Sequence, residues 1–455
     1  MAARPNILWM VADDHRFDAL GAAGDPVIRT PNLDALVARG TLCARNYMMG
    51  GNSGAVCVPT RASLLTGANP VRAHVGSRLV EGSGGGIAPD LPTLPEVLAG
   101  VRYRTFAVGK WHNDRQSFAR SFAGGARLFF GGMSDHRAVP MHEYDAAGEY
   151  LERDRRPAEG FSSELFADAA IDFLRGYRGP DPFCLYVAFT APHDPRTPPP
   201  PYGAMYDPDA IPLPDNFLPA HPFDNGEMQV RDERLAPFPR TQAAVRRHTA
   251  DYYGMITHLD ANIGRMLATL EAVGHREDTV VVYTADHGLA VGRHGLMGKQ
   301  NLYDHSVRVP LILAGPGLPR GRRVERLTQS YDVFPTLCAL TDTPVPRTVE
   351  GRSLLPLARG QEAAGHDSAW AMYRDVQRMV TDGRWKLIRY YRSLRRGSGT
   401  DRIQLFDLES DPGETRDLAG SPGSAERIHA LAQRLGRWQL EVGDPLVGLP
   451  VLPAG

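Results

Sequence analysis

Short apolar runs alternate with stretches of helical periodicity through the first three quarters of the chain. Each apolar run is continuous, which predicts strands that are buried on both faces of a sheet. Strands that alternate with helices indicate an α/β fold, in which a large, mostly parallel central sheet is flanked by helices. The predicted strands are Asn6–Ala12, Thr105–Val108, Phe183–Phe189, Thr279–Thr284 and Val309–Leu313. The predicted helices are Asn32–Arg39, Arg61–Leu65, Leu94–Leu98, Ser162–Arg175 and a long helix within Arg246–Ala272.

The pattern changes after about residue 357. Two short strand patterns flank an Asp-Gly pair, which predicts a hairpin, and a third strand and an amphipathic helix follow. We therefore expect a catalytic α/β domain over residues 1–357 and a smaller α+β subdomain, with an antiparallel sheet, over residues 358–455. The segments of this subdomain are Gln377–Asp382, Arg384–Tyr391, Leu405–Leu408 and Ala425–Leu440. The proline-rich segment Thr197–Pro237 has no periodicity and is predicted to be a long surface loop near a cleft.

Composition excludes several functions. The 51 basic and 52 acidic residues give a net charge of −1, which argues against partners such as nucleic acid or anionic membranes. No apolar stretch approaches the ~20 residues of a membrane span. The first apolar run, Ile7–Ala12, is too short for a signal-peptide core, so we expect a cytoplasmic protein. Four widely spaced cysteines indicate neither a zinc site nor a disulfide framework.

The basic residues are almost all arginine. Only Lys110, Lys299 and Lys386 are lysines among the 51 basic residues. Since arginine fills the general surface role, each lysine is a candidate for a role that specifically needs an ammonium group.

Acidic residues follow two of the predicted strands. Asp13 and Asp14 end the first strand, and Asp286 with His287 follows Thr279–Thr284. At one edge of a parallel sheet these groups would converge on a single divalent cation, and hard carboxylate oxygens suit calcium or magnesium. The alternative for each pair is an ordinary turn or helix cap.

A second signal is Cys57-Val-Pro59-Thr-Arg61, at the start of a predicted helix. Proline is accepted in a first helical turn, and a helix N-terminus favours bound anions. The alternative is a small buried cysteine before a helix.

The Cys57-x-Pro59-x-Arg61 motif, followed by Leu-Thr-Gly, resembles the signature of the type I sulfatases of the alkaline phosphatase superfamily. Further blocks resemble that family in the expected order along most of the chain. These blocks are PNILWMVADDHR, TPNLDALVARG, GKWH, APHDP, TADHG, GKQNLYDHSVRVPLI and LFDLESDPGETRDLA. The resemblance implies an alkaline-phosphatase-like fold and hydrolysis of sulfate esters.

The resemblance also implies a cofactor set. A formylglycine-generating enzyme would oxidise Cys57 to formylglycine, whose hydrate is the nucleophile. Asp13, Asp14, Asp286 and His287 would hold one divalent metal together with an oxygen of modified Cys57. Calcium is favoured, and magnesium or manganese are alternatives because many relatives have asparagine at the position of His287.

The same resemblance implies the catalytic roles. Arg61 would fix the hydrated aldehyde, and Lys110 would bind that diol and the sulfate. His193 would protonate the leaving alcohol with help from Lys299, and His112 would deprotonate the second hydroxyl to expel sulfate. Lys386 has no role in this scheme.

Specificity is less defined by the sequence. Gly131–Arg137, Asp194, Arg196 and His305 are candidates for the leaving-group pocket, with ordinary solvated loops as the alternative. We expect a small-molecule or oligosaccharide sulfate ester, either a sulfated carbohydrate or an aryl sulfate. A phosphonate monoester or phosphodiester hydrolase is an alternative, and a non-catalytic binding protein on the same scaffold is another. An oligomer is left open.

Overall fold

The computed structural model describes residues 4–76, 85–361 and 365–448. Its centre is an eight-stranded sheet in the order β13-β2-β12-β11-β1-β10-β6-β7. The described pairings in this sheet are parallel except for the two made by β12. The strands are β1 (Asn6–Asp13), β2 (Thr41–Tyr47), β6 (Arg104–Lys110), β7 (Gly125–Phe129), β10 (Phe183–Pro192), β11 (Thr279–Ala285), β12 (Leu311–Ala314) and β13 (Arg322–Gln329). The predicted large, mostly parallel sheet is confirmed.

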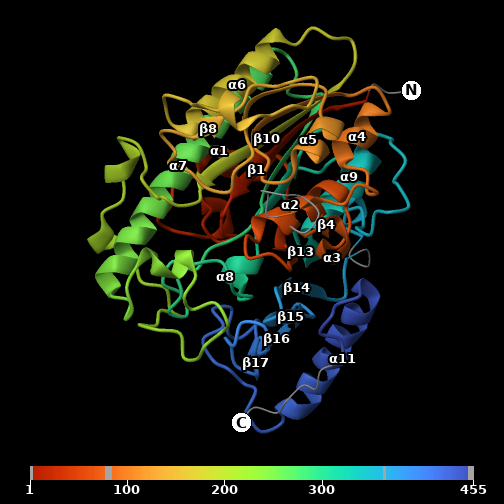
Figure 1. Cartoon of the computed structure of the whole chain (residues 1–455). Helices are drawn as coiled ribbons and strands as arrows, with labels where there is room; N and C mark the ends of the chain where they lie inside the picture. The colour runs from red at the N-terminus through yellow and green to blue at the C-terminus, as the bar shows by residue number, and fades with distance from the viewer. Residues whose placement is uncertain (1–3, 77–84, 362–364, 449–455) are drawn as a thin grey trace.

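Helices cover both faces of this sheet (Figure 1). Helices α1, α6 and α7 lie on one face, and α2, α4, α5 and α9 lie on the other. The helices are α1 (Pro31–Arg39), α2 (Cys57–Thr66), α3 (Pro70–Ala73), α4 (Leu94–Ala99), α5 (Arg115–Ser121), α6 (Ser162–Gly176), α7 (Gln242–Ala272), α8 (Asp304–Val307), α9 (Val333–Leu340), α10 (Leu355–Ala358) and α11 (Ser424–Val442).

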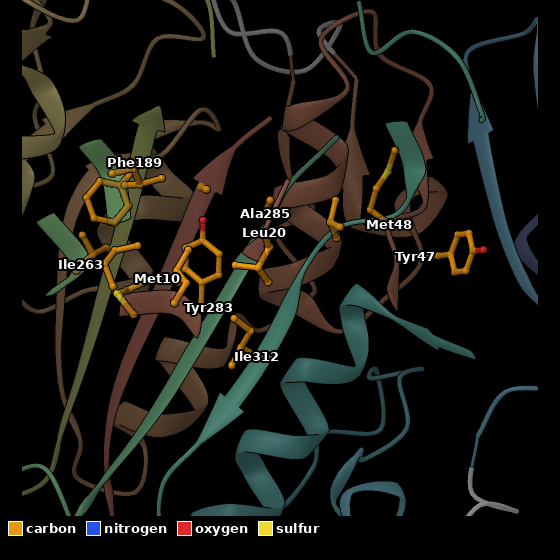
Figure 2. Packing of buried hydrophobic residues seen from close by; sticks show 14 of the residues in the cluster. Met10, Leu20, Tyr47, Met48, Phe189, Ile263, Tyr283, Ala285 and Ile312 are labelled. Atoms are coloured by element: carbon orange, nitrogen blue, oxygen red, sulfur yellow. The ribbon is translucent and has the colours of Figure 1, made fainter. Parts of the chain in front are cut away.

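Strand β1 shows why the sheet is covered on both sides. Its eight residues are all buried, and successive side chains point to opposite faces. Leu8 and Met10 enter the core shared with α6 and α7, whereas Ile7 and Trp9 enter the core shared with α2 and α4. Figure 2 shows Met10 beside Ile263 of α7 in the first of these cores. A strand without a solvent-facing side must lie at the centre of the sheet.

A second sheet lies beyond one edge of the first, at the bottom of Figure 1. Its order is β17-β16-β15-β14-β3, and α11 packs against it. The strands are β14 (Ala369–Tyr373), β15 (Gln377–Thr381), β16 (Trp385–Tyr390), β17 (Arg402–Asp407) and β3 (Gly50–Gly51). The predicted hairpin is β15–β16, and the predicted smaller C-terminal subdomain is present. Because β3 comes from residues 50–51, its pairing with β14 also fixes the position of the chain a few residues before Cys57. The domain boundary at residue 357 stays a prediction.

The predicted loop over Thr197–Pro237 contains three short 3-10 helices, at Tyr202–Ala204, Pro208–Ala210 and Arg231–Leu235, the last called η5 below. The remaining short strands pair two by two outside the main sheets. They are β4 (His74–Val75) with β5 (Gly86–Ile87), and β8 (Pro140–Met141) with β9 (Arg156–Pro157). Among the described helices, none has both the length and the apolar character that crossing a membrane requires.

Candidate active site

The predicted acidic residues meet where the central parallel strands end. Asp13 is the last residue of β1, and Asp286 directly follows β11. Ala12 pairs in register with Ala285, so the two following carboxylates lie side by side. Ligand atoms of Asp13, Asp14, Cys57 and Asp286 all lie within 4.8 Å of one another. The structure therefore brings together four of the five residues predicted to bind a metal.

Asp14 adopts a left-handed backbone conformation, with φ of 70°. This conformation is costly for a residue with a side chain, so surrounding contacts must hold it. The Tyr252 hydroxyl, on α7, donates to the Asp14 carbonyl oxygen at 2.6 Å, and Asp286 Oδ1 accepts from the Asp14 amide at 3.2 Å. Sequence reasoning did not identify Tyr252, because one tyrosine on a long helical pattern carries no signal of its own.

Helix α2 places the cysteine motif against the same strand ends. The helix begins at Cys57, all its residues are buried, and Gly67 ends it in a left-handed conformation in which a Cβ would contact Phe334. Cys57 Sγ lies 3.6 Å from Asp13 Oδ1. One helical turn later, Arg61 Nε donates to Asp286 Oδ2 at 2.8 Å, and Nη1 donates to the Lys110 carbonyl oxygen at 3.0 Å. Arg61 thus links α2 to the ends of β11 and β6.

Two of the three lysines enter this cluster. Lys110, the last residue of β6, forms an ion pair with Asp13 and also donates to the Gly132 carbonyl oxygen. Lys299 Nζ lies 2.6 Å from Asp14 Oδ1 and 3.1 Å from Cys57 Sγ. Lys110 therefore contacts Asp13, whereas Lys299 contacts both Asp14 and Cys57.

The three carboxylates do not titrate alike. Burial raises the pKa of Asp14 well above its usual range, and repulsion from Asp13 and Asp286 adds to this. Burial likewise raises the pKa of Asp286, with Asp13 contributing. For Asp13, the effect of burial is outweighed by the nearby charges of Lys110 and Lys299, which hold its pKa well below the usual value. Three buried carboxylates this close repel one another unless a cation lies among them.

Burial also raises the pKa of the Cys57 thiol, with repulsion from Asp286 adding to the shift. An unmodified thiol with a raised pKa stays protonated at neutral pH and is then a weak nucleophile. In contrast, the neighbouring carboxylates keep Lys299 charged: although burial opposes this, Asp14 and Asp13 raise the Lys299 pKa well above its usual value.

The predicted histidines lie around this cluster. His193 follows β10, its Nδ1 bonds to the Asp194 carbonyl oxygen at 2.8 Å, and its Nε2 lies 3.7 Å from Asp14 Oδ2. Burial and the charge of Lys299 lower the His193 pKa to about 4, so the ring is neutral at pH 7 in the free protein. An anionic ester beside Nε2 would raise that pKa by Coulombic attraction. His112 follows Lys110 by two residues, and burial, then Lys110, lower its pKa well below the usual value.

His287 is buried but contributes no atom to the four-residue group described above. Its Nε2 lies 3.2 Å from the Thr60 hydroxyl on α2. Its role as a metal ligand therefore stays a prediction.

The structure places the residues predicted for the leaving-group pocket in different surroundings. The loop 131–137 borders the site, because Gly132 accepts from Lys110 and His136 Nε2 lies 2.9 Å from the His193 carbonyl oxygen. Asp194 bonds to Arg231, and Arg196 bonds to His248. His305 instead packs beside Tyr303 and His294, whose rings stack on each other.

Several buried polar atoms of the cluster have no hydrogen-bond partner among the described residues. They include Asp14 Oδ2 and Arg61 Nη2. An acceptor without a donor suits a cation, and a guanidinium donor without an acceptor suits an anion. The residues present therefore fit a divalent metal bound beside a negatively charged group.

Comparison with known proteins agrees with this chemistry. A family model described as Sulfatase matches residues 5–343, and one described as N-sulphoglucosamine sulphohydrolase, C-terminal, matches residues 292–441. The N-acetylglucosamine-6-O-sulfatase of Bacteroides thetaiotaomicron is 24% identical over 518 aligned positions, covering 97% of this chain and 87% of that protein.

Solved structures show the same fold. A protein solved in complex with its substrate D-glucosamine-2-N,6-O-disulfate has a TM-score of 0.79 at 23% identity, covering 98% of this chain and 99% of that one. The phosphonate monoester hydrolase of Agrobacterium radiobacter has a TM-score of 0.74 at 24% identity, with 96% of each chain covered. The likeness in fold extends over almost the whole chain.

Proposed function

The chain belongs to the sulfatase family and is a sulfuric ester hydrolase, and from that premise we propose that it cleaves a sulfate monoester through a formylglycine made from Cys57. The observation that carries the proposal is the convergence of Asp13, Asp14, Asp286 and Cys57 ligand atoms within 4.8 Å. The nucleophile and the metal ligands would then act on one sulfate group. A formylglycine-generating enzyme is the partner that this proposal requires.

We propose calcium as the cation, held by Asp13, Asp14, Asp286 and the modified Cys57, with His287 beside them. Carboxylate oxygens without thiolate or multiple imidazole ligands favour a hard cation, so magnesium and manganese are the competing ions. When bound, the cation supplies Lewis-acid stabilisation of negative charge at the sulfate.

The remaining residues surround the place where the sulfate would lie. Arg61 and Lys110 are held by Asp286 and Asp13, and in the proposal they bind the hydrated aldehyde and the sulfate oxygens. With its pKa raised by the bound anionic ester, His193 would carry a proton on Nε2 and give it to the leaving oxygen, and Lys299 would stabilise the charge that develops there. If Cys57 is present as hydrated formylglycine, His112 would accept the proton of its second hydroxyl, so that the C–O bond to sulfate could break and the aldehyde form again.

For the substrate we propose a sulfated carbohydrate, with an aryl sulfate as the simpler alternative. This is supported by the names of two similar proteins: one is an N-acetylglucosamine-6-O-sulfatase, and the other was solved with a disulfated glucosamine. A screen of sulfated mono- and disaccharides, with release of inorganic sulfate as the readout, tests the proposal.

A phosphonate monoester or phosphodiester hydrolase would use the same cluster, because these esters carry a charge similar to that of a sulfate monoester. The fold does not separate the two, since a phosphonate monoester hydrolase also superposes on this chain. Turnover of an aryl sulfate should exceed turnover of the matching aryl phosphonate ester. The reverse preference would overturn the sulfatase proposal.

Cys57→Ala should abolish turnover and leave the fold intact, because it removes the nucleophile but buries no new polar group. Activity and near-ultraviolet circular dichroism measure the two parts of this prediction. Mass spectrometry of the tryptic peptide that contains Cys57, from protein made in its native host, tests the modification itself. An unmodified thiol in active protein would show that the nucleophile is a different group, and one in inactive protein would favour a binding protein.

A further inference from the structure

Arg231 is the first residue of η5, in the irregular loop that precedes α7. Its side chain is 42% exposed, and it nevertheless pairs with two buried carboxylates, Asp194 and Asp232. We propose that Arg231 is a positioning residue that holds His193 and Lys299 in one relative orientation. The inference rests on the proposed function, in which these two side chains assist departure of the alcohol.

The first connection leads to His193. Arg231 binds the Asp194 carboxylate with both terminal nitrogens, with Nη2 to Oδ1 at 3.0 Å and Nη1 to Oδ2. Asp194 in turn fixes the imidazole, because its carbonyl oxygen and its Oδ1 lie 2.8 Å and 3.4 Å from His193 Nδ1. With Nδ1 fixed in this way, Nε2 points towards Asp14. A two-pronged guanidinium–carboxylate pair restrains rotation as well as distance.

The second connection leads to Lys299. Arg231 Nη2 also lies 2.5 Å from Asp232 Oδ1, and the other oxygen of Asp232 accepts from Gln300 Nε2 at 2.7 Å. Gln300 Oε1 then accepts from the backbone amide of Lys299 at 3.1 Å. The Lys299 ammonium reaches Asp14, which His193 Nε2 also faces. The two connections therefore start at one guanidinium and converge again on one carboxylate.

The geometry requires arginine at this position. A planar guanidinium can bind two carboxylates at once, whereas an ammonium is a single point of charge. The exposure of Arg231 also matters, because truncation of a half-exposed side chain leaves space that water fills. Loss of Arg231 should therefore disturb the orientation of His193 and Lys299 more than it disturbs folding.

A misplaced proton donor affects some substrates more than others. General acid assistance contributes roughly 10²–10⁴-fold when the leaving oxygen is strongly basic, and it contributes little when the leaving group is already stable as an anion. A series of substituted phenyl sulfates, from 4-nitrophenyl sulfate to 4-methoxyphenyl sulfate, varies the basicity of the leaving oxygen with little change in size.

The experiment measures kcat and KM of wild type, Arg231→Ala and Arg231→Lys over this series. We expect Arg231→Ala to lose about 30-fold or more in kcat on 4-methoxyphenyl sulfate and less than about 3-fold on 4-nitrophenyl sulfate. Arg231→Lys should fall between wild type and Arg231→Ala. Arg265→Ala is the matched control, because Arg265 is similarly exposed at 48% and pairs with Asp168 on α6; it should behave like wild type.

Equal losses across the series, or no loss, would overturn the positioning role, since a structural defect lowers the amount of competent enzyme for every substrate alike. A wild type that hydrolyses no sulfate ester would instead overturn the proposed function. Thermal unfolding of each variant verifies that the enzymes compared are folded.

Discussion

Two buried ionic clusters of this protein contain the same kinds of residue but differ in how completely their charged groups are paired. The cluster that we propose to be catalytic, called the catalytic cluster below, consists of Asp13, Asp14, Asp286, Arg61, Lys110 and Lys299. The interface cluster consists of Lys386, Asp304, Glu414 and Arg308, and it joins β16 and the segment after β17 to α8. Each cluster contains as many basic as acidic groups.

The difference lies in how completely the carboxylates are paired. In the interface cluster each carboxylate oxygen faces a basic group or a hydrogen-bond donor. Lys386 Nζ lies 2.8 Å from Asp304 Oδ1 and 2.7 Å from Glu414 Oε1, the latter as an ion pair without a hydrogen bond. Arg308 and the Tyr47 hydroxyl bind Asp304, and Glu414 Oε2 accepts from the Asp304 amide. In the catalytic cluster, Asp14 Oδ2 and Arg61 Nη2 have no partner among the described residues. A cluster whose carboxylates all face their own cations or donors stabilises the fold, and one with free acceptors and donors can take a ligand.

This comparison predicts first that the interface cluster matters mainly for stability. Lys386→Met leaves two buried carboxylates without their shared cation, and breaking a buried pair in this way costs about 3–5 kcal/mol. Urea unfolding should show this loss, while kcat below the unfolding transition should stay near that of wild type. Arg265→Ala, which removes a half-exposed pair, should cost about 0–1 kcal/mol. A Lys386→Met enzyme that is stable but inactive would contradict the comparison.

The second prediction concerns a lysine of the catalytic cluster. Lys299→Arg should lower kcat about 100-fold, or about 2.7 kcal/mol of barrier, because a planar fork cannot take the place of a compact ammonium between Asp14 and Cys57. Its free energy of unfolding should change much less than that of Lys386→Met. Near-normal turnover would show that Lys299 lies outside the reacting groups.

A third prediction uses the metal. Calcium at ten times its dissociation constant should stabilise chelator-treated protein by roughly 1.4 kcal/mol, since a ligand that binds only the folded state stabilises it. The measurement is urea unfolding with and without the ion. Lys386→Met should keep this increment and Asp14→Asn should lose most of it. An increment that survives in Asp14→Asn would place the cation elsewhere.

The sequence predicted the parts of the fold that are buried on both sides. All five strands predicted for the central sheet are present, because their continuous apolar runs are a strong signal. It missed β13, whose sequence RRVERLTQ is half exposed, as expected for a strand at the edge of the sheet. It also missed β2 and β14, where polar or small residues interrupt the pattern.

Most of the catalytic cluster was predictable because its residues follow strands or sit in one short motif, whereas Lys299 was identified through the family resemblance. Lys386 was not, because its partner Asp304 lies 82 residues away and no local pattern connects them. Arg231 and Tyr252 were missed for the same reason: their contacts bridge loops and a helix that only the folded chain brings together. Contacts of this kind are set by packing, so single-sequence reasoning has no access to them.

The smallest expected effect tests whether protonation of the interface cluster makes the free energy of unfolding depend on pH. Burial raises the pKa of Glu414 to about 7, so this carboxyl keeps its proton in the folded state at pH values where the unfolded chain has released it. The contribution of Glu414 to stability is therefore complete below pH 4, falls as the pH rises through about 7, and then levels off. Glu414→Gln removes this pH-dependent contribution, so the stability difference between pH 6 and pH 7 should shrink by about 1 kcal/mol relative to wild type. Urea unfolding at several pH values measures this difference. If the free energy of unfolding depends on pH as steeply in Glu414→Gln as in wild type, Lys386 keeps Glu414 ionised throughout this range. The interface cluster would then be held together by ion pairs alone.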